Sequence, residues 1–185
     1  MKLTIATMLL LLMVAPAIAQ QTRAGADKND TNPPKALDQT DKKFLKDAAI
    51  DNVAEVEMGQ LAEQKASSSD VKQFGARMVK DHSAANDKLK ALAAAEHVAL
   101  PTELDAQHKN AKASISNLTG KNFEQAYMSL MVQDHTKAVQ KFQKEASSAS
   151  AQSVKQFAST TVPTLEEHLK EAKNIESKVQ NEAVR

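Results

Sequence analysis

Apolar residues recur at three- and four-residue intervals along most of the chain, which is the pattern of helices that bury one face. These stripes predict four long helices, over residues 40–66, 70–97, 122–147 and 151–180. Thr40 or Asp41 is expected to cap the first helix, and a short serine turn at residues 67–69 is expected to cap the second. The pattern therefore indicates an all-α protein.

Prolines mark two interruptions in this pattern. Pro101 ends the second helix, and Thr102 with Glu103 can start a shorter polar helix over residues 102–116. Pro163 lies inside the last helix, where it lacks an amide donor and crowds the preceding turn. A kink is expected there, because the apolar stripe resumes on both sides.

Two hairpins of long helices joined by a longer middle segment favour a four-helix bundle. The middle segment, residues 97–122, is long enough to run along the bundle, which permits the crossover of ferritin-like folds. A simple up-down-up-down order is the alternative. A weak internal repeat agrees with paired hairpins: Val71-Lys-Gln-Phe74 recurs as Val154-Lys-Gln-Phe157.

The N-terminal residues have the features of an export signal. Lys2 precedes an apolar run of 12 residues, and Ala17-Ile18-Ala19 fits the small-x-small cleavage rule. Residues 1–19 are therefore interpreted as a signal peptide cleaved after Ala19, since about 20 apolar residues are needed to span a membrane. A retained N-terminal anchor is the alternative.

The predicted organisation after cleavage is a flexible polar leader over residues 20–39, a helical domain over 40–180 and a short tail over 181–185. No second membrane span is expected. The protein is predicted to be periplasmic or secreted.

Composition excludes several classes of function. The sequence has no cysteine, so disulfides, thiolate nucleophiles and cysteine-ligated metals are ruled out. Its 24 basic and 23 acidic side chains nearly balance, which gives no support for a nucleic-acid partner. No phosphate-binding loop, nucleophile elbow or His-Glu-x-x-His motif occurs.

Histidines give the sharpest chemical hypothesis. His82, His135 and His168 lie on or beside the apolar stripes of three helices, and Glu55 lies in line with the stripe of the first. Counting residues from the turns places Glu55, His82 and His135 near mid-height, with His168 roughly 7 Å further along its helix. His97 and His108 are expected at a helix end and on a solvated face.

One carboxylate and two or three imidazoles suit a divalent first-row metal such as zinc, iron or copper. Met78 and Met131 each lie four residues before one of the histidines and would favour copper(I) if they faced the site, although methionine is also ordinary core filler. A carboxylate di-iron centre is excluded, because that centre needs Glu-x-x-His on two helices and the sequence lacks this motif.

The competing interpretation is a metal-free hydrogen-bond network that fixes the register of the bundle. Asp81 and Asp134 directly precede two of the histidines. Since adjacent residues diverge on a helix, these aspartates are expected to be supporting partners rather than ligands.

Several short blocks of the chain, in their order and spacing, resemble a family of exported bacterial proteins. The blocks are Asp41-x-x-Phe44, Ala48-Ala49, Glu55-Val56, Gly59, Leu61-Ala62, Val71-x-x-Phe74, Met78-Val79-x-Asp81-His82, Phe123-x-x-x-Tyr127, Asp134-His135 and Pro163-x-Leu165-x-x-His168-Leu169-x-x-Ala172. The chain resembles domain-of-unknown-function family 4142, whose members are often labelled outer-membrane or exported proteins. The resemblance implies a ferritin-like four-helix bundle with a short extra helix in the middle crossover, and no established activity.

The sequence thus predicts an exported helical bundle that binds a metal ion through Glu55, His82, His135 and His168, in an envelope or stress-protection role. The alternative is a metal-free structural module that binds an envelope protein. A metal-dependent oxidase is a third hypothesis, and a non-catalytic role is favoured over it.

Overall fold

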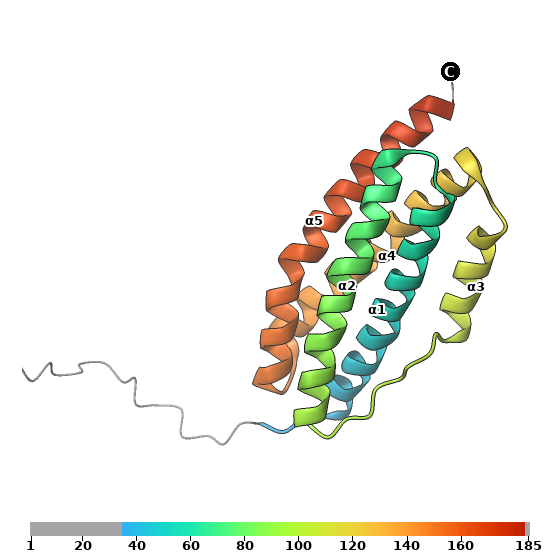
Figure 1. Ribbon diagram of the computed structural model, residues 1–185. Coiled ribbons are helices and arrows are strands. Elements are labelled where there is room, and N and C mark those ends of the chain that lie inside the picture. Colours follow the sequence, from blue (N-terminus) through green and yellow to red (C-terminus); the bar gives the residue numbers. More distant parts are fainter. Residues whose placement is uncertain (1–34, 184–185) are drawn as a thin grey trace, which may run out of the picture. The chain divides into compact units, whose positions relative to one another are not determined.

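The structure is a computed structural model that describes residues 35–183, and the predicted signal peptide and most of the predicted leader lie outside this range. Five helices follow one another in the described chain, and four of them form a bundle (Figure 1). Their bounds are α1 Gln39–Lys65, α2 Ser69–Ala95, α3 Ala106–Ser116, α4 Gly120–Ser148 and α5 Gln152–Ala183. The described chain is all-helical, as predicted, and α5 continues into the expected tail.

Two carboxylates define the direction of the helices. Asp41, at the start of α1, accepts hydrogen bonds from the backbone N–H groups of Ser150 and Ala151 in the α4–α5 turn. Glu124, in the first turns of α4, accepts hydrogen bonds from Ser67 and Ser68 in the α1–α2 turn. The start of α4 therefore lies at the opposite end of the bundle from the start of α1, so α4 runs parallel to α2.

The connection from α2 to α4 consequently crosses the length of the bundle, with α3 packed along the outside (Figure 1). Helices α1 and α2 form one antiparallel hairpin, and α4 and α5 form the other. This is the crossover order of ferritin-like folds, and it excludes the simple up-down-up-down alternative.

An internal repeat relates the two hairpins. The shared Val-Lys-Gln-Phe sequences start at Val71 and Val154, which are separated by 83 residues. The same separation relates Asp41 to Glu124, and each of these carboxylates binds the turn of the other hairpin. The weak sequence repeat is therefore a structural one.

Helix starts differ from the sequence expectations because carboxylates, not hydroxyls, supply the caps. Asp38 caps α1, with Asp41 completing a capping box, where Thr40 or Asp41 was expected. Ser68 caps α2 without a side-chain hydrogen bond, since Glu124 takes the N–H groups at that turn. Asp105 caps α3, which therefore starts three residues after Glu103.

Helix α2 ends in a Schellman motif. His97 has a positive φ of 55°, and its N–H bonds to the carbonyl of Ala94, while the Val98 N–H bonds to Ala93. Helix α5 continues through Pro163 as one helix, so the expected interruption does not divide it.

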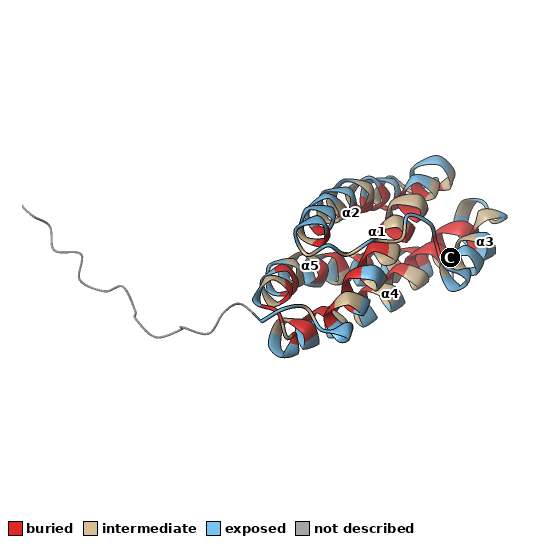
Figure 2. Cartoon of the chain, turned by 90° about the horizontal axis from the view of Figure 1, so that it is seen from below, coloured by how far each residue is buried: buried red, intermediate tan, exposed pale blue. Residues whose placement is uncertain are grey.

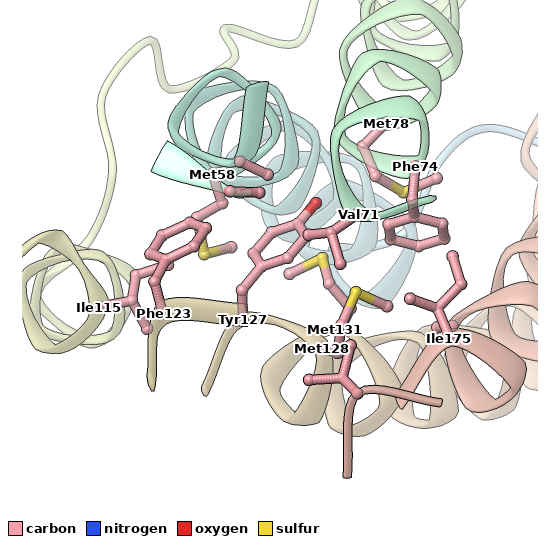
Figure 3. Close-up of a cluster of buried hydrophobic side chains, with 14 of the residues drawn as sticks. Met58, Val71, Phe74, Met78, Ile115, Phe123, Tyr127, Met128, Met131 and Ile175 are labelled. Atoms are coloured by element: carbon pink, nitrogen blue, oxygen red, sulfur yellow. The ribbon is translucent and has the colours of Figure 1, made fainter. Parts of the chain in front are cut away.

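Buried side chains form two apolar clusters, and buried residues line the inner faces of the helices (Figure 2). One cluster, drawn in Figure 3, includes Phe74, Phe123 and Tyr127, and the other includes Phe44 and Phe142. In α2, α4 and α5 a buried histidine separates the residues of one cluster from those of the other, and in α1 buried Asn52 and Glu55 lie at that boundary. The bundle therefore has a polar layer at mid-height between two apolar halves.

Two glycines allow α1 and α2 to pack very closely. A Cβ atom added at Gly59 would lie 2.7 Å from the Gly75 carbonyl oxygen, and one added at Gly75 would lie 2.8 Å from that of Gly59. Each backbone therefore occupies the space that a side chain of the other would need.

Candidate metal centre

Three histidines from three helices meet in the polar layer. The ring centroids of His82 in α2, His135 in α4 and His168 in α5 are separated by 5.3–5.6 Å. One nitrogen of each ring lies within 4.8 Å of one nitrogen of each other ring. All three side chains are buried, His135 and His168 at 1% exposure. Spacing on the apolar stripes thus correctly placed these three residues at one level.

His168 joins the cluster although residue counting set it apart. It lies 16 residues after the start of α5, and His82 lies 13 residues after the start of α2, a difference of about 4.5 Å rather than 7 Å. Helical side chains lean towards the N-terminus of their own helix. Because α2 and α5 are antiparallel, this lean brings the two rings towards each other.

The Nδ1 atoms of two rings are bonded to carbonyl-type oxygens. His82 Nδ1 lies 2.9 Å from the Asn52 side-chain oxygen, and His135 Nδ1 lies 2.9 Å from the Met131 backbone oxygen. Both oxygens only accept hydrogen bonds, so each Nδ1 must carry the proton. The lone pair of each neutral ring is then on Nε2.

His168 has the opposite tautomer. Its Nε2 lies 3.0 Å from Asp81 Oδ2, and Asp81 in turn accepts from the Arg77 guanidinium. Arg77 also donates to Glu167 and Glu171 of α5. The pKa of Asp81 is lowered, because hydrogen bonds from His168 and Arg77 outweigh the effect of burial. Asp81 is therefore a charged acceptor that fixes the lone pair of His168 on Nδ1.

The remaining nitrogens, His82 Nε2, His135 Nε2 and His168 Nδ1, are buried and have no hydrogen-bond partner. Leaving a buried polar group unsatisfied costs about 1–3 kcal/mol. Each ring is held by an oxygen at one nitrogen and exposes its lone pair at the other, which is the arrangement that metal-ligating histidines adopt.

Electrostatics keep the three rings neutral. Burial lowers the pKa of His82 well below its ordinary value, and the neighbouring histidines lower it further. Burial also lowers the pKa of His135 to about 4, and it lowers the pKa of His168 despite the opposing effect of Asp81. The rings are therefore in the protonation state that binds metal ions near neutral pH.

Glu55 is buried next to this cluster but is not part of the group of three. Its Oε1 lies 3.9 Å from His135 Nδ1, the nitrogen that is bonded to Met131. Its Oε2 is buried without a partner. Burial raises the pKa of Glu55 well above its ordinary value, and Asp134 and Asp51 raise it further. A role of Glu55 as a ligand stays a prediction.

A cavity of ≈ 320 Å³ connects the histidines with the outside of the bundle. Its lining includes all three rings, Asn52 and Glu55, together with residues of α3 and of the outer parts of α1 and α4. The site is thus accessible to small molecules.

The mouth of the cavity contains a network that sequence reasoning missed. His108 was expected on a solvated face, but it lies between Asp105, at 2.8 Å, and Asp51, at 3.4 Å. Hydrogen bonding to Asp51 and Asp105 raises the pKa of His108 to about 9. Lys141 Nζ lies 2.7 Å from the other Asp51 oxygen. The missed signal was Asp105, whose capping of α3 turns His108 inwards.

The two methionines do not support a copper(I) site of mixed sulfur and nitrogen ligands. Met78 and Met131 are fully buried in the apolar cluster of Figure 3, and the cavity lining includes neither of them. Asp134 lies 3.6 Å from Lys137 and lines the cavity. Of the two predicted supporting aspartates, Asp81 thus contacts a histidine, while Asp134 is paired with a lysine.

Comparison with known families identifies the chain. The DUF4142 family, a domain of unknown function, matches residues 26–175. The chain belongs to the DUF4142 family. This confirms the resemblance seen in the short sequence blocks. No curated protein matches this DUF4142 chain.

Two solved structures share the fold. A DUF305 fragment from Deinococcus radiodurans has a TM-score of 0.69 at 12% identity, covering 79% of this chain and 99% of that one. A DUF305 protein from Streptomyces coelicolor, provisionally described as secreted, has a TM-score of 0.66 at 14% identity, covering 76% of this chain and 92% of that one. At these identities the comparison establishes the helical-bundle fold of the DUF4142 chain alone. None of the described helices is long and apolar enough to cross a membrane.

Proposed function

We propose that the protein binds one first-row transition-metal ion through His82 Nε2, His135 Nε2 and His168 Nδ1. The observation that carries this proposal is the meeting of three buried, unpartnered nitrogen atoms whose rings are each held by an oxygen on the other side. Three nitrogen ligands are the donor set of several metal sites in proteins.

A metal ion explains the three nitrogens better than a single water molecule does. All three nitrogens present lone pairs, and one water molecule has only two protons to donate. A metal ion accepts all three lone pairs. With metal–nitrogen distances of about 2.0–2.1 Å, ligand nitrogens lie roughly 3.4 Å apart. Rings whose nitrogens already lie within 4.8 Å of one another need only small side-chain rotations to reach this distance.

The donor set favours zinc, iron or copper, because imidazole suits these metals and no sulfur lines the cavity among the described residues. Hard cations such as magnesium and calcium are disfavoured, since they prefer oxygen ligands.

A purely structural network is the competing function, and one observation supports it. The Asn52–His82 bond links α1 to α2, and the Asp81–His168 bond links α2 to α5. Such a network satisfies its own members, however, whereas this one leaves one nitrogen of every histidine without a partner. Metal binding is therefore the better account.

We also propose that the protein acts outside the cytoplasm, in an envelope or stress-protection role that depends on this metal. The apolar run of residues 3–14 with the Ala17-Ile18-Ala19 site supports export. The secreted description of the Streptomyces coelicolor structure agrees with it.

The proposal is tested by titrating the purified, metal-free protein with zinc, iron(II) and copper while heat is measured. One ion per chain is expected for at least one of these metals. His168→Ala should abolish the binding, and His97→Ala, an exposed histidine, is the matched control that should retain it. Equal binding by both variants, or no binding by the parent, would exclude the site.

A further inference from the structure

Three histidines leave the metal ion incompletely coordinated. Zinc and related ions take at least four ligands, and a site with three protein ligands keeps a position for an exogenous group. The cavity of ≈ 320 Å³ reaches the three rings, so this position faces a space that molecules can enter.

Glu55 is the protein group that could close this position, and its geometry argues against it. The Glu55 carboxyl lies beside the Nδ1 edge of His135, where Met131 occupies the nitrogen. The lone pair of His135 is on Nε2, at the other nitrogen of the ring. Glu55 thus contacts the side of the ring that the metal does not use.

Asn52 presents a free hydrogen-bond donor next to the open position. Its side-chain oxygen is bonded to His82 Nδ1, and this bond fixes the orientation of the amide. Its Nδ2 is buried without a partner, the residue is 6% exposed, and it lines the cavity. A donor of this kind is satisfied by a ligand that carries an acceptor atom.

Charge indicates what kind of acceptor fits. Three neutral imidazoles do not offset the charge of a divalent ion, and a buried unbalanced charge is costly. Asp81, the nearby carboxylate, is already paired with His168 and Arg77. At the mouth, the cations of Lys141 and His108 flank the route inwards. An anion supplies both the missing charge and the missing acceptor.

We propose that the cavity admits a small monoanion, of the size of azide or formate, which completes the coordination of the metal ion and accepts a hydrogen bond from Asn52 Nδ2. A water molecule occupies about 30 Å³ of liquid, so a cavity of ≈ 320 Å³ has room for such an ion and accompanying water. This inference rests on the proposed metal site and identifies the class of ligand that the site takes.

Cobalt(II)-loaded protein provides the test, because its visible spectrum reports the ligands of the ion. Cobalt uptake is measured first, and sodium azide is then titrated into the loaded protein. The parent is expected to show a saturable spectral change. Asn52→Asp keeps an oxygen for His82 and removes the donor, so it should retain cobalt and bind azide at least tenfold more weakly.

Ala138→Leu tests the access route. Ala138 lines the cavity one turn after His135, so a larger side chain there should fill the space. This variant should bind cobalt like the parent and should lose the azide response. Ala91→Leu, the same change at an exposed position of α2, is the matched control and should behave like the parent in both measurements.

The outcomes separate this inference from the metal site itself. Cobalt uptake without any azide response in the parent would overturn the inference and leave the metal site standing. An azide response of equal affinity in the parent, Asn52→Asp and Ala138→Leu would also overturn it. Failure of the parent to bind cobalt or any other first-row ion would overturn both proposals.

Discussion

Asp81 and His168, from the adjacent helices α2 and α5, are joined by a bond of 3.0 Å between Asp81 Oδ2 and His168 Nε2. Arg77, one turn before Asp81, donates to the same carboxylate oxygen. The pair determines which His168 nitrogen carries the proton. His168 therefore points its Nδ1 lone pair at the other two histidines, which bind through Nε2.

Replacement of Asp81 is predicted to weaken metal binding without removing a ligand. Loss of an acceptor behind a metal-bound histidine commonly reduces metal affinity about 10–100-fold. Asp81→Ala should fall in this range, and Asp81→Asn, which keeps an acceptor oxygen, should be affected less. Competition titration against a chelator measures both. Glu167→Ala, which removes a mostly exposed partner of Arg77, is the control, and equal affinity of Asp81→Ala and the parent would contradict the assignment.

The close contact of α1 and α2 predicts that Gly59→Ala destabilises the protein. The added methyl group would lie 2.7 Å from the Gly75 carbonyl oxygen, so the two helices must move apart. Overpacking of this kind costs about 1–3 kcal/mol. Urea denaturation should show the loss, and Gln60→Ala, at the exposed neighbouring position, should differ from the parent by about 0.5 kcal/mol or less. A stable Gly59→Ala variant would contradict the packing described here.

The two turn-binding carboxylates predict a paired effect on stability. Glu124→Ala removes the acceptor of two backbone N–H groups at one end of the bundle, and Asp41→Ala does so at the other. Each variant is expected to lose about 1–3 kcal/mol of unfolding free energy. Glu124→Gln should lose less than Glu124→Ala, because an acceptor oxygen remains. Denaturant unfolding that ranks Glu124→Gln as equal to Glu124→Ala would exclude this role.

The lowered histidine pKa values predict that acid destabilises the metal-free protein. An ordinary histidine takes up its proton near pH 6.5, whereas His135 in the folded protein does so at about 4. Between these values the unfolded chain binds more protons, so the unfolding free energy falls as the pH falls. The contribution of His135 approaches about 1.4 kcal/mol per pH unit. Denaturation at pH 7, 6 and 5 with a chelator present should show a shallower slope for His135→Leu, and identical slopes would disprove the prediction.

Much of the fold followed from the sequence, because helix periodicity and turns are local properties. The predicted ranges of the four long helices agree with the structure to within three residues at each end. The histidines of α2, α4 and α5 could be placed at one level, since a helix rises by a constant amount per residue. The crossover also followed from the length of the middle segment, although its direction required the contacts of Asp41 and Glu124.

The remaining features depend on contacts between residues distant in the sequence. Asn52, which orients His82 from a neighbouring helix, carries no local signal of this role. Glu124 caps a turn 56 and 57 residues away in the chain, so the serines there could not reveal it. His108 was expected in solvent, because nothing in its own helix shows that Asp51 lies opposite.

Metal analysis of the protein purified without chelators, beside a His82→Ala/His135→Ala double variant, tests the central claim most directly. The account predicts close to one first-row metal ion per chain in the parent and none in the folded double variant. A parent that contains no metal and takes up no zinc, iron or copper would contradict it, as would a double variant with the same metal content as the parent.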